Sequence, residues 1–200
     1  MNRRVFAVLL ALAVLSPLSY GLAPAQAQVV ERVGLRGRYV VECRDASGRL
    51  RWRETVHNVV TTVGINLMLD TSFLGSGYTA TGPFAGLISG ASFSGVSASD
   101  TMASHPGWIE SGLANPPTYL TGRRTVTFSS AAAGQIATSA PFSFSITGTG
   151  VVGGVFIVYG SGASATIDDT GGTLYSASVF DTTHTVSPFD TININYATGM

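Results

Sequence analysis

The side chains that could do chemistry are concentrated in one stretch, residues 99–110, of a chain with few charged residues. His105 lies between Asp100 and Glu110 and directly follows Ser104, so a hydrolase built from Ser104, His105 and Asp100 is one interpretation. Against it, adjacent residues such as Ser104 and His105 usually point apart. No nearby motif supplies the oxyanion site that a serine nucleophile requires. We therefore predict no enzymatic activity and no catalytic residue.

The same stretch has the features of a structural loop. Pro106-Gly107 is typical of a turn. We predict that His105 and Asp100 bond to backbone groups and that the large ring of Trp108 closes the end of the core. In this interpretation Asp100, His105, Trp108 and Glu110 are structural or interface residues.

Two other groups of residues could bind a metal ion. Glu54 and His57 are three positions apart and His184 lies elsewhere, but this spacing forms di-iron sites only when it is repeated on paired long helices. Asp168-Asp169 together with Asp181 could bind calcium, although an aspartate pair next to glycines is typical of a turn. We predict no metal site and no cofactor.

The glycine-rich run Gly150–Gly154 is not a phosphate-binding loop, because it lacks the lysine and the helix that such loops have. It predicts a strand that another backbone approaches closely. Cys43 is the single cysteine, so it has no partner for an intramolecular disulfide. We expect it on the inward face of a strand as an unreactive thiol.

The composition favours an all-β fold. The 200 residues include 24 glycines and no lysine, and only 11% of them are charged, which is typical of short strands and tight turns. This length is enough for one domain with a substantial core.

Charge is unevenly distributed although the formal net charge is zero. Residues 31–54 contain seven arginines and four acidic residues (7 minus 4, +3), whereas residues 55–200 contain two arginines and seven acidic residues (2 minus 7, −5). This asymmetry could guide contact between subunits or weakly attract the N-terminal part to a polyanion, and it is too small to indicate nucleic-acid binding.

The N-terminus resembles a secretory signal peptide. Arg3 and Arg4 precede an apolar run, residues 5–18, and small residues alternate before a cleavage position after Ala25 or Ala27. The run is short for a membrane span, so no stable span is expected after cleavage. The alternatives are a retained apolar anchor and a start codon assigned too early. We expect a leader over residues 1–28 and one β-sandwich domain over residues 29–200.

An N-terminal hairpin is the first structural element that we expect. Period-two alternation predicts a strand over Arg36–Cys43, a turn at residues 45–48 and a second strand over Arg49–Arg53. Pairing Arg44 with Arg49 would place Glu42 opposite Arg51 and Val41 opposite Trp52. Arg49, Arg51 and Arg53 then form either a docking surface or an ordinary solvated strand face.

A helix is expected after the hairpin, over Val59–Asp70, with Asn58 as its N-cap. Gly64 in its middle either weakens the helix or marks a close contact with the sheet.

The remaining sequence predicts a series of strands. We expect them over Phe84–Ser89, Arg124–Ser129, Phe142–Thr147, Val151–Tyr159 and Thr173–Phe180, and a last strand with Ile192, Ile194 and Tyr196 inward. The predicted fold is an antiparallel β-sandwich or jelly-roll-like domain with one short helix.

These elements carry a family resemblance that extends in order from Gly37 to Ala197. The matching pieces are Tyr39–Asp45 with Gly48, Trp52 and Glu54; His57–Thr61 with Gly64, Asn66, Leu69 and Asp70; Phe84–Ile88; Asp100–His105 with Gly107, Trp108 and Glu110; Phe144–Thr147; Gly153–Phe156; Gly172–Ala177; and Asp190–Tyr196. In this pattern the chain resembles small structural proteins from the virions of tailed bacteriophages. The resemblance also matches Tyr119 to a tyrosine that follows the tryptophan motif, with Arg123 or Arg124 as the basic residue after it.

The resemblance implies a non-enzymatic virion component, in head decoration, a tail or a fibre joint, that works through contacts with other subunits and forms a homo-oligomer. The expected location is the virion, or the periplasm or cell exterior if the leader is a signal peptide. The leader sets the chain apart from such proteins, so a misassigned start, an exported prophage gene and a cell-surface particle remain alternatives. A second function is an exported binding module, in which Trp108 and Tyr119 on loops would bind glycans.

Overall fold

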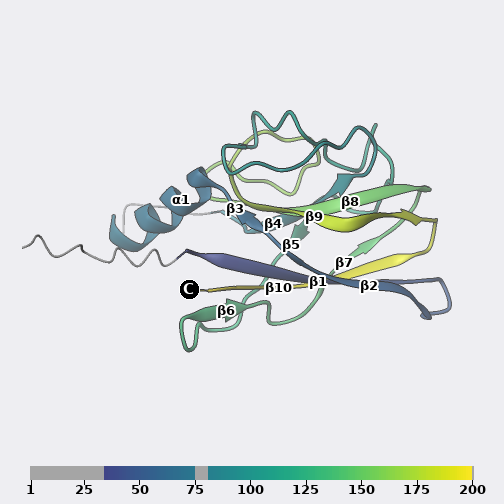
Figure 1. The fold of residues 1–200 in the computed structure, drawn as a ribbon, viewed down its shortest axis with the longest axis horizontal. Coiled ribbons are helices and arrows are strands. Elements are labelled where there is room, and N and C mark those ends of the chain that lie inside the picture. Colours follow the sequence, from purple (N-terminus) through teal and green to yellow (C-terminus); the bar gives the residue numbers. More distant parts are fainter. Residues whose placement is uncertain (1–33, 75–80, 200) are drawn as a thin grey trace, which may run out of the picture. The chain divides into compact units, whose positions relative to one another are not determined.

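Two antiparallel sheets face each other across the main core (Figure 1). The computed structural model describes residues 34–74 and 81–199, so the expected leader lies outside the described residues. The predicted class is confirmed: the protein is an all-β sandwich with one short helix after an N-terminal hairpin. In the described part of the chain, no helix has the length and apolar character needed to cross a membrane.

The strands divide between the sheets in a mixed order. The elements are β1 (Arg36–Arg44), β2 (Leu50–His57), β3 (Val59–Val60), α1 (Thr62–Phe73), β4 (Phe84–Ser89), β5 (Arg124–Thr125), β6 (Gln135–Ala137), β7 (Phe142–Ser145), β8 (Gly150–Tyr159), β9 (Thr173–Val186) and β10 (Thr191–Gly199). The first sheet has the order β2-β1-β10-β6, with β7 also paired to β10, and the second has the order β3-β9-β8-β4-β5.

The two central strands of the first sheet carry the predicted inward faces. Tyr39, Val41 and Cys43 of β1 are buried, and Ile192 and Ile194 of β10 are buried with them. Alternate residues of these strands are more exposed, because successive side chains of a strand point to opposite faces of a sheet. The alternation in the sequence was therefore a sound guide to the core.

The second sheet is covered on both faces. Val155 and Ile157 of β8 point into the main core, whereas Phe156 and Val158 belong to a second cluster on the other face. The long connection between β4 and β5 supplies Trp108 to this second cluster. A strand with two buried faces reads as a continuous apolar run, which explains the predicted strand at β8.

The hairpin between β1 and β2 forms, but its predicted register is wrong. Cys43 pairs with Trp52 and Glu42 pairs with Arg53, whereas the expected partner of Glu42 was Arg51. The pairing is therefore displaced by two residues along β2.

The turn and a bulge beside it each contribute one residue to this displacement. Arg44 pairs with Leu50 instead of the expected Arg49, and a register shift between Cys43 and Arg44 adds the second residue. Gly48 adopts a positive φ of 81° within the turn. Hydrophobic alternation does not reveal an extra unpaired residue, so the sequence pattern could not place the bulge.

The helix begins later than predicted, and Asn58 is not its cap. Val59 and Val60 form a short strand paired with β9. Thr61 is the N-cap, because its hydroxyl accepts a hydrogen bond from the amide of Gly64 at 3.0 Å. Two β-branched valines favour a strand where a partner is available, and the helix starts only after them.

Gly64 marks a close contact between α1 and β9. This is one of the two interpretations of Gly64 that the sequence allowed. A Cβ built on Gly64 would lie 2.4 Å from the carbonyl oxygen of Tyr175. We therefore expect Gly64→Ala to lower the free energy of unfolding by about 1–3 kcal/mol, although alanine favours an isolated helix by about 1 kcal/mol. Urea denaturation measures the change. The control Asn66→Ala lies on the exposed side of the same helix and should be neutral or stabilising; equal effects at both positions would contradict the close contact.

The later strands differ from the predicted bounds at their ends. β5 ends at Thr125, and Phe128 makes only an isolated bridge with Thr138. β6 was not predicted, and β9 continues to Val186, beyond the expected end at Phe180. Strand ends depend on which partner strand is beside them, and this information is not local.

Candidate functional site

The stretch at residues 99–110 is a hydrogen-bonded corner on the second sheet. The indole Nε1 of Trp108 donates to a carboxylate oxygen of Asp100 at 3.0 Å, and the same oxygen accepts from the amide of Ser97 at 2.9 Å. Nδ1 of His105 donates to the carbonyl of Trp108 at 2.9 Å, and the two rings stack with centroids 3.8 Å apart. Trp108 is 1% exposed and packs against Phe156.

This arrangement does not assemble the residues of a hydrolase. Asp100 and His105 each bond to Trp108, so the carboxylate does not orient the imidazole. The amide of Ser104 donates to Thr101 within a local turn, and Ser104 is exposed. The geometry matches the predicted loop, in which Trp108 closes the core.

Glu110 forms a buried ion pair with Arg123, which is 2% exposed. The guanidinium donates from Nε at 2.9 Å and from Nη2 at 2.8 Å to the two carboxylate oxygens. Arg123 also donates to the carbonyls of Ser164 and Asp169, and Glu110 accepts from the amide of Asp168. The pair therefore ties two parts of the β4–β5 connection to each other and to the β8–β9 connection.

Burial dominates the electrostatics of this pair. It raises the pKa of Glu110, while the hydrogen bonds and charge of Arg123 act in the opposite direction. The guanidinium carbon of Arg123 also lies 5.4 Å from the ring centroid of Phe156. Both carboxylate oxygens of Glu110 already accept hydrogen bonds from its own chain, so the ion pair holds the loops in place. Sequence reasoning named Glu110 but reached Arg123 only through the resemblance.

Of the three residues weighed as transition-metal ligands, Glu54 and His184 are in contact, whereas His57 is not part of that contact. Glu54 and His57 point to opposite faces of β2, because residues three apart on a strand alternate sides. Glu54 bonds to Nε2 of His184 at 2.7 Å, and that imidazole stacks on Trp52 with centroids 4.0 Å apart. This contact joins β2 to β9.

The aspartates weighed for calcium bond to different parts of the chain. The amide of Asp181 donates to Glu54, whereas Asp169 accepts from Ser164 and from the amide of Gly171. Within residues 34–74 and 81–199, no three histidine, cysteine, aspartate or glutamate side chains are grouped as a metal site requires.

The arginines of the hairpin are engaged by their own chain. Arg51 pairs with Asp190, Arg49 pairs with Asp45 at 3.2 Å, and Arg53 lies 3.5 Å from Glu42. A charge that already has an intramolecular partner contributes less to docking. Of the two open interpretations of Arg49, Arg51 and Arg53, these pairs favour the solvated strand face.

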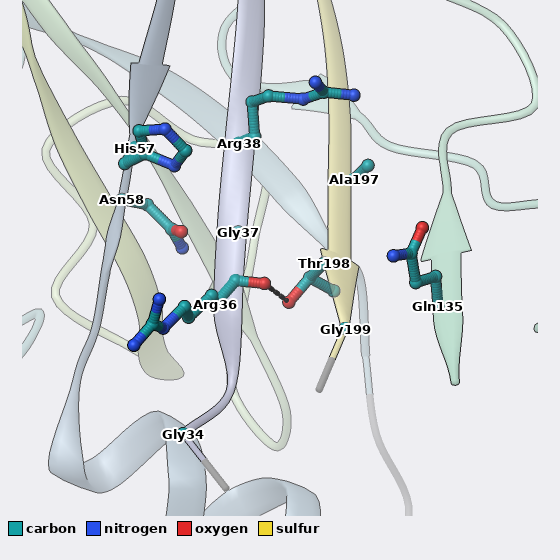
Figure 2. A pocket seen from close by; sticks show the side chains of 10 residues that line it. All are labelled: Gly34, Arg36, Gly37, Arg38, His57, Asn58, Gln135, Ala197, Thr198 and Gly199. Atoms are coloured by element: carbon teal, nitrogen blue, oxygen red, sulfur yellow. Dashed lines mark hydrogen bonds between the residues drawn. The ribbon is translucent and has the colours of Figure 1, made fainter. Parts of the chain in front are cut away.

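A basic groove lies at the opposite end of the hairpin. Figure 2 shows Arg36 and Arg38 on β1, reaching to opposite sides of that strand, with His57 on one flank and Gln135 on the other. The groove has a volume of about 870 Å³, and its described lining contains no acidic residue. Neither guanidinium bonds to another described residue, in contrast to those of the hairpin tip. Sequence reasoning missed this site because all seven arginines of the region look alike in the sequence.

The outer side of α1 is the second surface that the sequence did not reveal. Gly64 and Leu67 of α1 are buried, whereas several large apolar residues of the helix and its C-cap are exposed. Ile65, Met68, Leu69, Phe73 and Leu74 are all exposed, with Phe73 81% and Leu74 66% exposed. We call these five residues the α1 patch. Large apolar side chains outside the buried stripe of a helix are normally covered by other groups.

Cys43 lies in the core as predicted, and burial raises the pKa of its thiol to about 11. At pH 8 only about 0.1% of such a thiol is ionised, against about a quarter of an ordinary cysteine. We therefore expect a chromogenic disulfide reagent to label the folded protein at least about 100-fold more slowly than the urea-unfolded chain. Fast labelling at pH 8 in a folded sample would contradict the burial.

The chain matches no family model, no curated protein and no solved structure.

Proposed function

We propose that the protein is a non-enzymatic structural subunit of a bacteriophage virion or a virion-derived assembly, and that it works through contacts with other subunits, including further copies of itself. The observation that carries this proposal is the α1 patch. Five large apolar side chains protrude from one short helix of a domain whose core is otherwise well packed. Large exposed apolar patches are a mark of interaction sites.

The exposed area of the patch is large enough to contribute to a contact. Its exposed side chains offer on the order of 600 Å² of surface, most of it apolar. The affinity of such a contact depends on shape complementarity and on the ordering cost of association, about 4–15 kcal/mol, and not on area alone.

Charge would select the partner surface. Arg36 and Arg38 have no ion-pair partner among the described residues, and they line a concave surface. Acidic groups on a neighbouring subunit would complement them, since charge pairs at an interface steer association and fix its register. This replaces the hairpin tip as the basic docking surface in the proposal.

Bacteriophage assembly is the favoured setting because of the sequence resemblance that runs from Gly37 to Ala197. The corner at residues 99–110 supports a structural role, since its distinctive side chains bond to one another and to backbone groups. The exported glycan-binding module has less support. Trp108 and Tyr119 are 1% and 7% exposed, so neither ring is available to stack on a sugar.

Fractionation of the producing cells tests the proposal. Particles are purified on a density gradient, washed with high salt and analysed by mass spectrometry next to the periplasmic and particle-free fractions. We expect peptides from residues 34–199 to peak with the particles after the wash. Finding them only in particle-free fractions would overturn the proposal, and finding them in the periplasm would support the exported module.

A further inference from the structure

We infer that the α1 patch binds a second copy of this chain, with Phe73 of each copy entering an apolar groove beside α1 of the other. The inference rests on the proposed function, because it names the partner and the surface for one of the subunit contacts.

The helix carries two apolar stripes. The inner stripe contains Gly64 and Leu67, which are buried against β9. The outer stripe follows a spacing of four residues from Ile65 through Leu69 to Phe73, and all three are exposed. Residues with this spacing lie on one side of a helix, so they form a continuous surface for a second helix.

An apolar groove opens next to this stripe. It has a volume of about 230 Å³ and is lined by Met68 and Thr71 of α1, together with Pro83, Phe128, Tyr159 and Tyr175 from the end of the sandwich. Most of its lining is apolar, and the space is sufficient for one aromatic ring. The structure leaves Phe73 81% exposed at the end of the same helix.

The protruding ring and the groove are on adjoining surfaces of one molecule. A two-fold axis places the same patch of both copies in contact, so each Phe73 can fill the groove of its partner while Ile65 and Leu69 pack across the axis. The helix-in-groove mode uses the same spacing of anchors.

The area of the α1 patch is close to the area that one copy buries in a typical dimer interface. A specific interface buries roughly 800 Å² per partner, and the α1 patch supplies on the order of 600 Å² of apolar surface before any contact from the groove rim is added. Two identical apolar patches can also bury each other's surface, so no different protein is required as the partner. The apolar run at residues 5–18 of the same chain and a lipid surface are the other occupants that the test distinguishes.

The test compares two phenylalanines of equal exposure. Phe73→Ser removes the protruding ring, and Phe189→Ser removes a ring that is 78% exposed in the turn between β9 and β10. Sedimentation equilibrium of the full chain, with its N-terminus identified by mass, should show a dimer for the wild type and for Phe189→Ser. Phe73→Ser should weaken dimerisation by about 100-fold, as for the central residue of an interface. A monomeric wild type, or equal weakening by both variants, overturns the inference.

Photo-crosslinking identifies the occupant directly. With p-benzoylphenylalanine in place of Phe73, we expect a product of twice the chain mass, joined to the peptide that contains Met68 or Pro83. Crosslinks to residues 5–18 within one chain would assign the patch to the leader, and crosslinks to added phospholipid vesicles would assign it to a membrane. Either result overturns the inference.

The same variants separate this inference from the proposed function. If the wild type dimerises through Phe73 but is absent from particles, the inference stands and the proposed function fails. If the wild type is monomeric but present in particles, the inference fails and the proposed function stands.

Discussion

Replacing Trp108 with alanine is expected to lower the free energy of unfolding by about 3–5 kcal/mol. The indole is 1% exposed and lies between the rings of His105 and Phe156. Its removal leaves a cavity under the corner at residues 99–110 and deprives the buried carboxylate of Asp100 of a hydrogen-bond donor. Urea denaturation followed by circular dichroism measures the change without relying on tryptophan fluorescence.

The variant Trp108→Phe separates the two causes. It keeps an aromatic ring against Phe156 but loses the bond from Nε1 to Asp100, so a smaller cost of about 1–3 kcal/mol is expected. A loss below about 1 kcal/mol for Trp108→Ala would show that the corner is not part of the folded core. Dimerisation should be unchanged in Trp108→Phe, because the corner and the α1 patch share no residue.

Arg123→Met is the second substitution with a large expected effect, a loss of about 3–5 kcal/mol. Methionine fills much of the same volume but leaves the carboxylate of Glu110 buried without its cation. The carbonyls of Ser164 and Asp169 also lose a donor. The control Arg124→Met changes the neighbouring arginine, whose guanidinium bonds to the exposed hydroxyl of Thr121, and should cost less than about 1 kcal/mol.

The loss in Arg123→Met should depend on pH in one direction. Burial already raises the pKa of Glu110, and without Arg123 nothing of comparable strength opposes it. A folded-state pKa above the unfolded value of about 4.3 means that the folded chain binds more protons between the two values, so stability falls as pH rises through that window. The difference from wild type should therefore be smallest below about pH 4 and largest at neutral pH. If the stability difference between Arg123→Met and wild type did not change with pH, the carboxylate of Glu110 would have found water or another partner in the variant, which would contradict this prediction.

The strands of the two sheets could largely be predicted from local sequence. Alternation identified the inward residues Tyr39 and Val41 of β1, and a continuous apolar run identified β8 as a central strand. Both patterns follow from the geometry of a strand and from whether one or two of its faces are covered. The predicted register of the hairpin was wrong because the alternation of apolar residues reveals neither the pairing at the turn nor a bulge beside it.

The corner at residues 99–110 could be identified from its composition, but its contacts could not. Pro106-Gly107 indicated a turn, and Trp108 was expected to close the core, as it does. The partner of Glu110 is Arg123, with 12 residues between them, and the carbonyls that complete the network come from residues 164 and 169. Such a network depends on how loops meet in space.

The sequence by itself determined the all-β class, most of the inward-facing residues and the turn chemistry of the protein, because these depend on neighbours within a few positions. Only the tertiary structure decided which charges are paired and which apolar residues remain exposed. Arg51 finds Asp190 across the sheet while Arg36 and Arg38 find no described partner, and α1 buries one apolar stripe but not the other. Pairing and burial depend on residues brought together from distant parts of the chain, so the surfaces available for contact with other subunits emerge only when the sheets are assembled.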